Sequence, residues 1–197
     1  IEMAYELGGG VFLVQSAWLS NDNLTMNIIE FAVRCQQRYS TQRHTLREIT
    51  LAGKCQNKSK MAQLLELEAF SSEWITKLDL SQNRLRDADL ALALVQISMA
   101  SNLETLILDG NVLGKESVEV LCPWLKEPSC PLRCLSIRDC GLGIKGVFEQ
   151  LLQCLGSAPF SKISTLHVSR LPLGAGVGEV LTQALLNSDR PAFLRTL

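Results

Sequence analysis

Residues 75–85 read Ile75-Thr-Lys-Leu78-Asp-Leu80-Ser-Gln-Asn83-Arg-Leu85, and this eleven-residue pattern decides the fold of the chain. Leucine or isoleucine occupies positions 1, 4, 6 and 11 of the pattern, and asparagine occupies position 9. The pattern returns at residues 103–113 with asparagine at position 9, and at residues 132–142 with cysteine there. Three matches in register, with starts at 75, 103 and 132, indicate an internal repeat whose copies stack on one another.

Looser copies extend the repeat toward both ends of the chain. The copy that starts at Ile163 has Leu171 at position 9, and the copy that starts at Leu46 keeps only its first half. A degenerate copy starts at Val14, and a partial one starts at Leu194. We therefore expect a single domain over residues 1–197 with about six repeats, starting near 14, 46, 75, 103, 132 and 163. Since no polar cap follows the partial repeat, we also expect a fragment of a longer protein.

Each repeat is long enough for one short strand and one helix. Positions 4 and 6 alternate with polar residues, which predicts a strand that turns both apolar side chains inward. Apolar residues then recur at helical spacing or acidic residues open a helix, and the predicted helices cover residues 27–39, 58–70, 87–97, 115–125, 147–155 and 177–186. Helices are wider than the spacing between parallel strands, so the stack should curve with its strands inside. The expected fold is an α/β solenoid with a parallel inner sheet and outer helices, about half of it helical.

Composition and charge argue against nucleic acid and membrane partners. Hydrophobic residues make up 47% of the chain and charged residues 20%, as expected for repeats that bury two flanks. The formal net charge of −1 lacks the basic excess that is typical of nucleic-acid binders. No apolar run reaches the ~18 residues of a membrane span. The stretch 10–19 has acidic residues before it, so a buried strand is favoured over a signal peptide.

The cysteines indicate a reducing compartment. There are seven of them, an odd number, and they include no C-x-x-C pair. Most fall at or beside positions predicted to be buried, where a free thiol acts as a small hydrophobic group. We therefore expect a cytoplasmic or nuclear protein. Because His44 and His167 are the only histidines and neither stands at ligand spacing, no metal site is expected.

Two glycine-containing turns leave an enzymatic alternative open. Residues 141–146 match G-x-G-x-x-G between a predicted strand and a predicted helix, which is formally a dinucleotide-binding motif. Residues 110–116 resemble a P-loop that is one residue short, with Glu116 where a hydroxyl is required. Both coincide with the turn of the repeat, so we interpret them as structural. The neighbouring Cys134 and His167 are expected to be a chance pair. We predict no catalytic residue and no cofactor; the alternative is a nucleotide-dependent enzyme that uses the glycine turns.

Residues 121–142, which read Leu121-Cys-Pro-Trp-Leu-Lys-Glu-Pro-Ser-Cys-Pro-Leu-Arg-Cys-Leu-Ser-Ile-Arg-Asp-Cys-Gly-Leu142, carry a family resemblance. They are similar to the repeat linker of ribonuclease-inhibitor-like leucine-rich repeats, which occur in ribonuclease inhibitor, NOD-like receptors and leucine-rich adaptors of ubiquitin ligases. The resemblance covers residues 46–197 well and 11–45 weakly, although the repeat lengths do not alternate strictly and Leu171 departs from the pattern. It implies a scaffold that binds a protein on its concave face, as a sensor or a ubiquitin-ligase substrate adaptor.

The alternation of the strands predicts which side chains would meet that partner. When the leucines of a strand point into the core, the intervening residues point to the concave side. We expect apolar anchors at Trp18 and Ile107. We also expect two tracks of charged or polar contacts across the strands, one formed by Asp79, Asp109 and Asp139 and the next by Arg138, His167 and Arg170. The predicted protein-binding residues are Trp18, Asp79, Ile107, Asp109, Arg138, Asp139, His167 and Arg170. The competing interpretation is that these apolar groups are ordinary surface residues and that the contacts lie elsewhere in a longer horseshoe.

Overall fold

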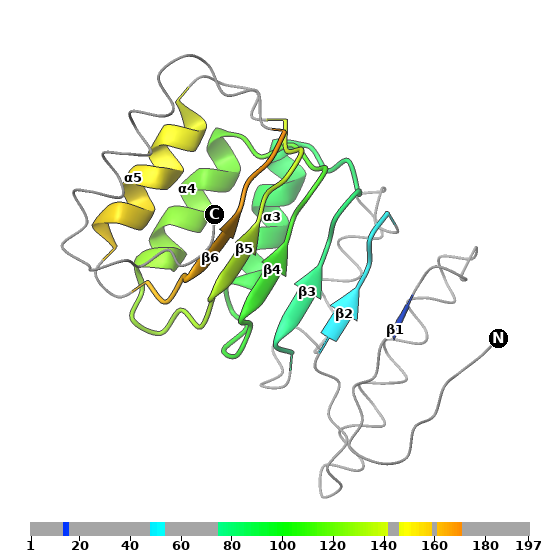
Figure 1. Cartoon of the computed structure of the whole chain (residues 1–197), viewed down its shortest axis with the longest axis horizontal. Helices are drawn as coiled ribbons and strands as arrows, with labels where there is room; N and C mark the ends of the chain where they lie inside the picture. Colours follow the sequence, from blue (N-terminus) through cyan, green and yellow to red (C-terminus); the bar gives the residue numbers. More distant parts are fainter. Residues whose placement is uncertain (1–13, 16–47, 54–74, 142–145, 159–160, 171–197) are drawn as a thin grey trace, which may run out of the picture.

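A computed structural model describes residues 14–15, 48–53, 75–141, 146–158 and 161–170 of the chain. Six strands form one parallel sheet in chain order, without crossovers (Figure 1). The strands are β1 (Val14–Gln15), β2 (Glu48–Thr50), β3 (Lys77–Asp79), β4 (Thr105–Ile107), β5 (Cys134–Ser136) and β6 (Thr165–His167). This topology confirms the parallel inner sheet that the repeat predicts.

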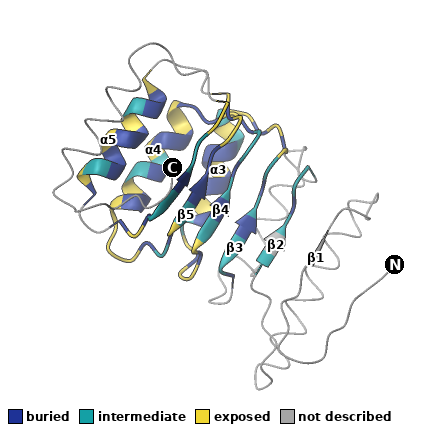
Figure 2. Cartoon of the chain, viewed as in Figure 1, coloured by how far each residue is buried: buried dark blue, intermediate teal, exposed yellow. Residues whose placement is uncertain are grey.

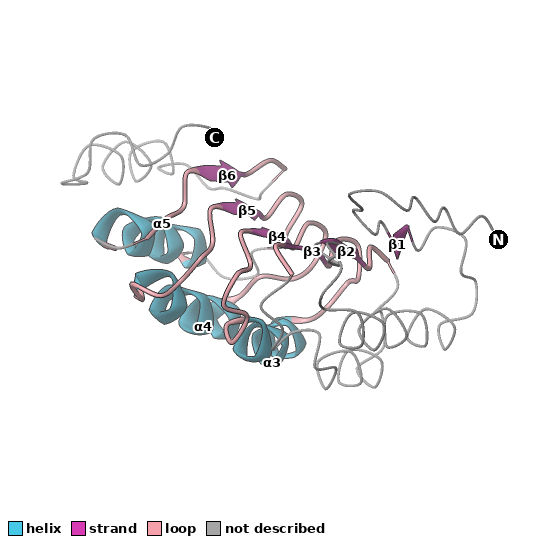
Figure 3. Ribbon diagram, turned by 90° about the horizontal axis from the view of Figure 1, so that it is seen from below, coloured by secondary structure: helices cyan, strands magenta, loops and turns pink. Residues whose placement is uncertain are grey.

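Three helices connect the central strands and lie on one side of the sheet, with the strands forming a separate layer (Figure 3). The helices are α3 (Asp87–Ile97), α4 (Lys115–Lys126) and α5 (Val147–Ser157). They match the helices predicted at 87–97, 115–125 and 147–155 to within two residues. Helices α3 and α4 pack against each other, as do α4 and α5. The helices predicted at 27–39, 58–70 and 177–186 lie outside the described residues.

Equivalent positions of successive repeats stack across the sheet. Position 4 pairs with position 4 at every step from β3 to β6, so Leu78, Leu106, Leu135 and Leu166 form one row of fully buried side chains. Position 6 adds a second buried row, formed by Leu80, Leu108 and Ile137. Because each repeat places the same side chain at the same depth, the core continues from one repeat to the next.

The core lies between the sheet and the helices (Figure 2). From the helix side, Leu94, Leu121 and Leu155 are fully buried against the strand leucines. Burial of one such side chain contributes about 1.5–3 kcal/mol relative to its exposure to water. A single strand of three residues could not be stable alone, so the strands depend on this shared core.

The register at the first strand differs from the sequence alignment. Val14 pairs with Ile49, which stands at position 4 of its repeat, and Gln15 pairs with Thr50. Val14 is therefore at position 4, whereas the alignment that starts a repeat at Val14 placed it at position 1. The shift of three residues follows from pairing: backbone hydrogen bonds between strands set the register, and the degenerate sequence around Val14 fits more than one alignment.

The described cysteines are free thiols, as expected from their number and spacing. Cys130, Cys140 and Cys154 are buried, while Cys122 and Cys134 are partly exposed. In the part of the chain that the structure describes, no cluster of three or more histidine, cysteine or acidic side chains could hold a metal ion. None of the described helices combines the length and the apolar character needed to span a bilayer.

Candidate protein-binding face

The exposed surface of the sheet, opposite the helices, is the candidate site, and we call it the strand face. Along β3, β4 and β6 the middle residue is buried and its two neighbours are partly exposed. Side chains at positions 3 and 5 therefore project from the strand face, while position 4 projects into the core. The predicted direction of these side chains is confirmed for β3, β4 and β6, whereas in β5 Ser136 at position 5 is buried.

A ladder of asparagine side chains holds the ends of the strands together beneath this face. The Nδ2 of Asn83 donates to the carbonyls of Leu51 and Leu80, at 3.1 and 2.7 Å. One repeat later, the Nδ2 of Asn111 donates to the carbonyls of Leu80 and Leu108, at 3.0 and 2.7 Å. Both asparagines are buried, so each satisfies backbone groups that would otherwise lack a partner. The ladder fixes the turn that follows each strand.

That turn has the same backbone conformation in every described repeat from β2 onward. The residue at position 8 is left-handed each time, with φ between 51° and 71°, and the five residues are Gly53, Gln82, Gly110, Asp139 and Arg170. Glycine adopts this conformation freely, whereas other L-residues adopt it at a cost. A Cβ on Gly110 would also collide with the amide of Gln82, which lies against it. The left-handed turn conformation therefore accounts for the glycines at this position.

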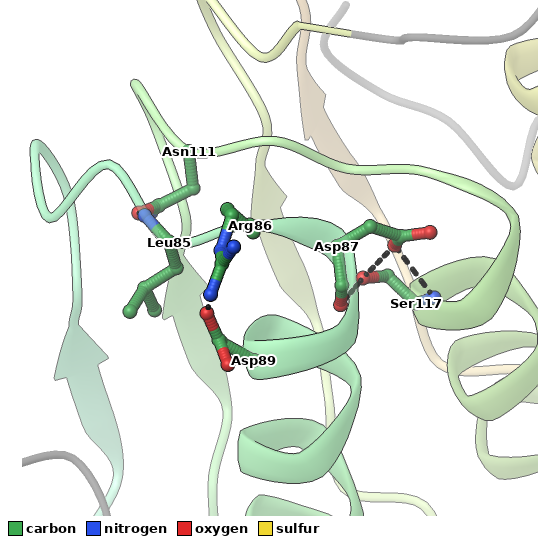
Figure 4. Close-up of polar contacts among 6 residues, drawn as sticks. All are labelled: Leu85, Arg86, Asp87, Asp89, Asn111 and Ser117. Atoms are coloured by element: carbon green, nitrogen blue, oxygen red, sulfur yellow. Dashed lines mark hydrogen bonds and ion pairs between the residues drawn. The ribbon is translucent and has the colours of Figure 1, made fainter. Parts of the chain in front are cut away.

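The end of the P-loop-like segment 110–116 binds a carboxylate of the same chain, that of Asp87, which also contacts Ser117 (Figure 4). At the start of α4, the backbone N–H groups of Gly114, Glu116 and Ser117 donate to the carboxylate of Asp87 over 2.9–3.0 Å. The Ser117 hydroxyl donates to the same carboxylate at 2.6 Å. A Cβ on Gly114 would collide with this carboxylate, so glycine is needed here. The N–H groups that would hold a phosphate are thus occupied by Asp87.

Asp87 is charged in this position. Partial burial raises its pKa, but the hydrogen bonds from Ser117, Glu116 and Gly114 lower the pKa by more. The net pKa therefore lies below its ordinary 3.8. The carboxylate comes from the first turn of α3 and caps α4, which has no capping side chain of its own. It therefore connects two consecutive repeats at the end of the strand face.

Two of the predicted site residues lie side by side on the strand face. Asp79 of β3 pairs in register with Ile107 of β4, and both are partly exposed. One oxygen of the Asp79 carboxylate accepts a hydrogen bond from the N–H of Ser81 at 2.8 Å, which orients the side chain. Ile107 in turn pairs with Ser136, which pairs with His167. Trp18, the other predicted anchor, lies outside the described residues.

The expected acidic track does not form. Asp79 is at position 5, Asp109 at position 7 and Asp139 at position 8, so the three carboxylates stand at different heights across the sheet. Asp109 also has a structural role: its Oδ1 accepts from the Ser136 hydroxyl at 2.7 Å and from the Arg138 N–H at 2.8 Å. The sequence alignment placed the carboxylates in neighbouring repeats correctly, but proximity also requires the same position within the repeat.

The remaining predicted residues form a charged ledge where β5 and β6 end. Arg138, Asp139 and Arg170 are all exposed, and none of them forms an ion pair with another described residue. His167, partly exposed, stands at the same end of β6. Arg138 and Asp139 lie just after the end of β5. His167 and Arg170 lie at and just after the end of β6, which is the neighbouring strand. We refer to these four residues as the ledge.

Sequence reasoning missed the charged pairs at positions 2 and 3. Lys77 Nζ contacts Glu48 Oε2 at 3.0 Å between β3 and β2, and Arg133 Nε contacts Glu104 Oε1 at 3.6 Å. A comparison of positions 2 and 3 between neighbouring repeats would have found both, because opposite charges stand there in register. Solvent-accessible ion pairs of this kind contribute about 0–1 kcal/mol to stability, so a binding partner can replace them with its own charges at little cost.

The thiol of Cys134 also lies on the strand face. It pairs in register with Thr165, not with His167, which faces Ser136. Burial raises the pKa of Cys134, although nearby Arg138 partly offsets this. A protonated thiol is a poor nucleophile, and the register does not place Cys134 opposite His167.

Comparison with known proteins agrees with this architecture. A family model described as Leucine Rich repeat matches residues 71–91, which include β3 and the start of α3. The repeats resemble leucine-rich repeats of the ribonuclease-inhibitor-like, NOD-like-receptor kind. Mouse NACHT, LRR and PYD domains-containing protein 5 is 27% identical over 164 residues, which is 83% of this chain. Mouse NACHT, LRR and PYD domains-containing protein 1a is 32% identical over 103 residues, or 52% of this chain.

The chain of leucine-rich repeats spans only 14% and 8% of the length of these two relatives. Among solved structures, the leiomodin-1 actin-binding site 2 has a TM-score of 0.59 at 13% identity, covering 82% of this chain and 89% of that one. The tropomodulin C-terminal domain of Caenorhabditis elegans has a TM-score of 0.54 at 16% identity, covering 80% and 92%. At these identities the likeness shows the fold alone.

Proposed function

We propose that this chain is a protein-binding module whose strand face receives another protein, and that it belongs to a longer sensor protein. The observation that supports this most is the ledge, where Arg138, Asp139 and Arg170 are exposed without an ion-pair partner among the described residues. Ile107 is partly exposed and lies on β4, where it pairs with Ser136 at the end of β5, next to the ledge. Exposed charge around an apolar centre is the usual composition of a protein interface.

The ledge favours a partner that carries charges of both signs. Its two guanidinium groups can each bind a carboxylate in a two-pronged contact, and Asp139 can accept hydrogen bonds from a lysine or arginine. Charges at the rim of an interface mainly accelerate association and select the partner, whereas a central apolar anchor slows dissociation. We therefore assign the ledge to recognition and Ile107 to affinity.

The relatives favour a sensor over a ubiquitin-ligase substrate adaptor. Both matched relatives are named for NACHT, LRR and PYD domains, and this chain is similar to a small part of each. The name of leiomodin-1 actin-binding site 2 gives that protein a protein partner, so the same architecture is used for protein binding elsewhere. The free described thiols support a cytoplasmic or nuclear location. We expect no nucleic acid and no membrane among the partners.

The first test identifies the partner and locates its binding surface together. Full-length protein would be used for affinity purification with quantitative mass spectrometry, in three forms: wild type, Arg138→Ala with Arg170→Ala, and Lys115→Ala with Glu119→Ala. The last form is the control, since Lys115 and Glu119 form an exposed ion pair on α4, on the helix side. We expect one or more proteins to be retained by wild type and control and reduced at least tenfold with the ledge variant.

The opposite pattern would contradict the assignment. If the α4 variant loses the partner and the ledge variant keeps it, binding takes place on the helix side. Asp109 is left unchanged in this design, because its removal would free the Ser136 hydroxyl and the Arg138 N–H and disturb the sheet itself.

A further inference from the structure

Helix α3 differs from its neighbours on the side that faces away from the sheet. Its core side is formed by Leu90, Leu94 and Ile97, which are fully buried. At 100° per residue, the direction opposite to these three is occupied by Ala88, Leu92, Val95 and Met99. We call these four residues the α3 stripe. Leu92 is 67% exposed, Met99 65% and Val95 40%, and Ala88 is exposed too.

The other described helices present polar residues in this direction. Helix α4 exposes Lys115, Glu119 and Lys126, and α5 exposes Gln150 and Gln153. An outward helix face that is apolar over its whole length is unusual for a protein surface, and contiguous apolar surface commonly marks a site of association. The α3 stripe is also separate from the strand face, since helices and strands lie in different layers (Figure 3).

The spacing within the α3 stripe is that of a helix–helix seam. Successive members are four, three and four residues apart, which is the d-a-d-a spacing of a heptad. The helical backbone continues far enough to include Met99: Ser98 is right-handed, and the Met99 N–H donates to the Gln96 carbonyl at 3.1 Å. A second helix can therefore pack along the stripe at a shallow angle.

The order 4-3-4 reads the same in both directions, so a second copy of α3 is complementary to the stripe. When a second copy of α3 runs antiparallel, a two-fold axis between Leu92 and Val95 places the stripe on its own image. Leu92 then faces Val95 of the second copy, and Met99 faces Ala88, so large side chains meet smaller ones. No member of the stripe carries a charge, so two copies can approach without repulsion between like charges.

We propose that the α3 stripe is the contact of a reversible homodimer, in which two copies of this chain pack α3 against α3 in antiparallel orientation. Three large exposed side chains along a helix of eleven residues bury far less than the ~800 Å² per partner of a standard interface. The dimer is therefore weak, with a dissociation constant on the order of 100 μM. Such an affinity leaves dilute protein monomeric and becomes effective when copies are brought together in an assembly.

Sedimentation velocity of the chain between about 1 and 500 μM measures the association around that dissociation constant, and charge complementation tests the register. Leu92→Glu alone and Val95→Lys alone each place a charge against an apolar side chain of the second copy, and each should weaken the dimer at least tenfold. An equimolar mixture of the two variants pairs the introduced glutamate with the introduced lysine at one contact and leaves Val95 against Leu92 at the other. We expect the mixture to dimerise within about threefold of wild type.

The control is Val112→Glu, which changes a 37% exposed apolar residue outside the α3 stripe and should leave the dimer unchanged. Circular dichroism melting of each variant verifies the fold, which surface substitutions should preserve. Wild type that stays monomeric at the highest concentration would overturn the proposal. So would equal loss in Val112→Glu, or a mixture that fails to dimerise. Because the ledge variants do not touch α3, these outcomes are independent of the proposed partner binding.

Discussion

At the scale of single residues, position 9 shows how one side chain can serve two repeats. The Asn111 amide donates to two carbonyls, and its Oδ1 accepts the N–H of Leu85 at 3.0 Å, as Figure 4 shows for the latter pair. At the same position one repeat later, the Cys140 thiol makes a weak sulfur hydrogen bond of 3.4 Å with the Leu108 carbonyl. Both side chains fill the turn, but only the amide satisfies several buried backbone groups.

We therefore predict unequal effects from two matched truncations. Asn111→Ala should lower the free energy of unfolding by about 2–4 kcal/mol, because it leaves buried donors and acceptors without partners. Cys140→Ala removes one weak bond and a small volume, and should cost about 1 kcal/mol. Urea unfolding followed by circular dichroism measures both. Equal losses would mean that position 9 acts by filling space alone.

Position 8 provides a second prediction at this scale. Asp139 has φ 53° and is exposed, so it holds the left-handed conformation without visible side-chain support. Asp139→Gly should raise the free energy of unfolding by about 0.5–1 kcal/mol, because glycine removes the steric cost of that conformation. The neighbouring Arg138 has no positive φ, so Arg138→Gly should destabilise the protein instead. If both variants shift stability in the same direction, backbone strain at Asp139 is not significant.

At the scale of helices and strands, each element depends on its neighbour for its ends. The start of α4 is capped by Asp87 from α3, across 27 residues of sequence to Gly114. The local sequence of α4 begins with glycine and offers no capping side chain. Capping between repeats explains how short helices are stable here: the stack supplies what each helix lacks.

The charge of Asp87 makes this cap sensitive to pH. Since its pKa in the folded protein lies below the ordinary 3.8, the stabilisation is complete above the pKa of the unfolded chain. It declines as the pH falls toward the folded pKa and is absent below it. At neutral pH, Asp87→Asn should cost about 1–2 kcal/mol, as is typical for loss of a helix cap. The difference between variant and wild type should begin to shrink as the pH falls below the ordinary 3.8 and should vanish only when the pH is below the lowered pKa of the folded protein.

Chemical denaturation at a pH of about 7, 5, 4 and 3 measures this convergence. Asp139→Asn is the control, because Asp139 is an exposed carboxylate that accepts no hydrogen bond from the described residues at its side chain. Its effect should be small at every pH. A deficit that stays constant even at a pH low enough to protonate the folded carboxylate would show that Asp87 contributes by shape and not by charge.

At the scale of the whole molecule, stacking of the repeats builds one continuous surface from the few exposed side chains of each repeat. Each repeat contributes a few side chains to the strand face, and parallel pairing in register lines them up across six strands. The same stacking brings a carboxylate to the helix N-terminus that a sequence motif would assign to phosphate. The architecture thus favours extended recognition of a macromolecule over a closed pocket for a small one.

The Asp87 carboxylate at the start of α4 predicts the result of a nucleotide titration. Calorimetry with ATP, GTP and NAD, with and without Mg²⁺, should show no saturable binding up to millimolar nucleotide. The reason is that Asp87 occupies the N–H groups of Gly114, Glu116 and Ser117. Residues 142–145 of the other glycine motif lie outside the described part, so the Gly141–Gly146 motif is tested only by this experiment. Saturable binding that is lost in Gly146→Ala would contradict this expectation and favour the nucleotide-dependent alternative.

The sequence by itself determined the repeating unit, its strand and helix, and the direction of the strand side chains. These follow from local rules: alternating leucines produce a buried strand face, and apolar spacing of three and four residues produces the helix. The helices at 87–97, 115–125 and 147–155 and the parallel order of the strands were predicted for this reason. The pattern is strong where leucine recurs and weak near Val14, where the register was wrong by three residues.

Only the tertiary structure decided which side chains meet. Asp79, Asp109 and Asp139 stand at positions 5, 7 and 8 of their repeats already in the sequence, but only the structure shows that Asp109 accepts hydrogen bonds from the Ser136 hydroxyl and the Arg138 N–H. Asp87 and α4 are far apart in sequence, and their contact depends on how far α3 lies from its neighbour. The physical reason is that contacts between repeats depend on register and helix packing distance, which arise from the whole stack and are not encoded in any one repeat.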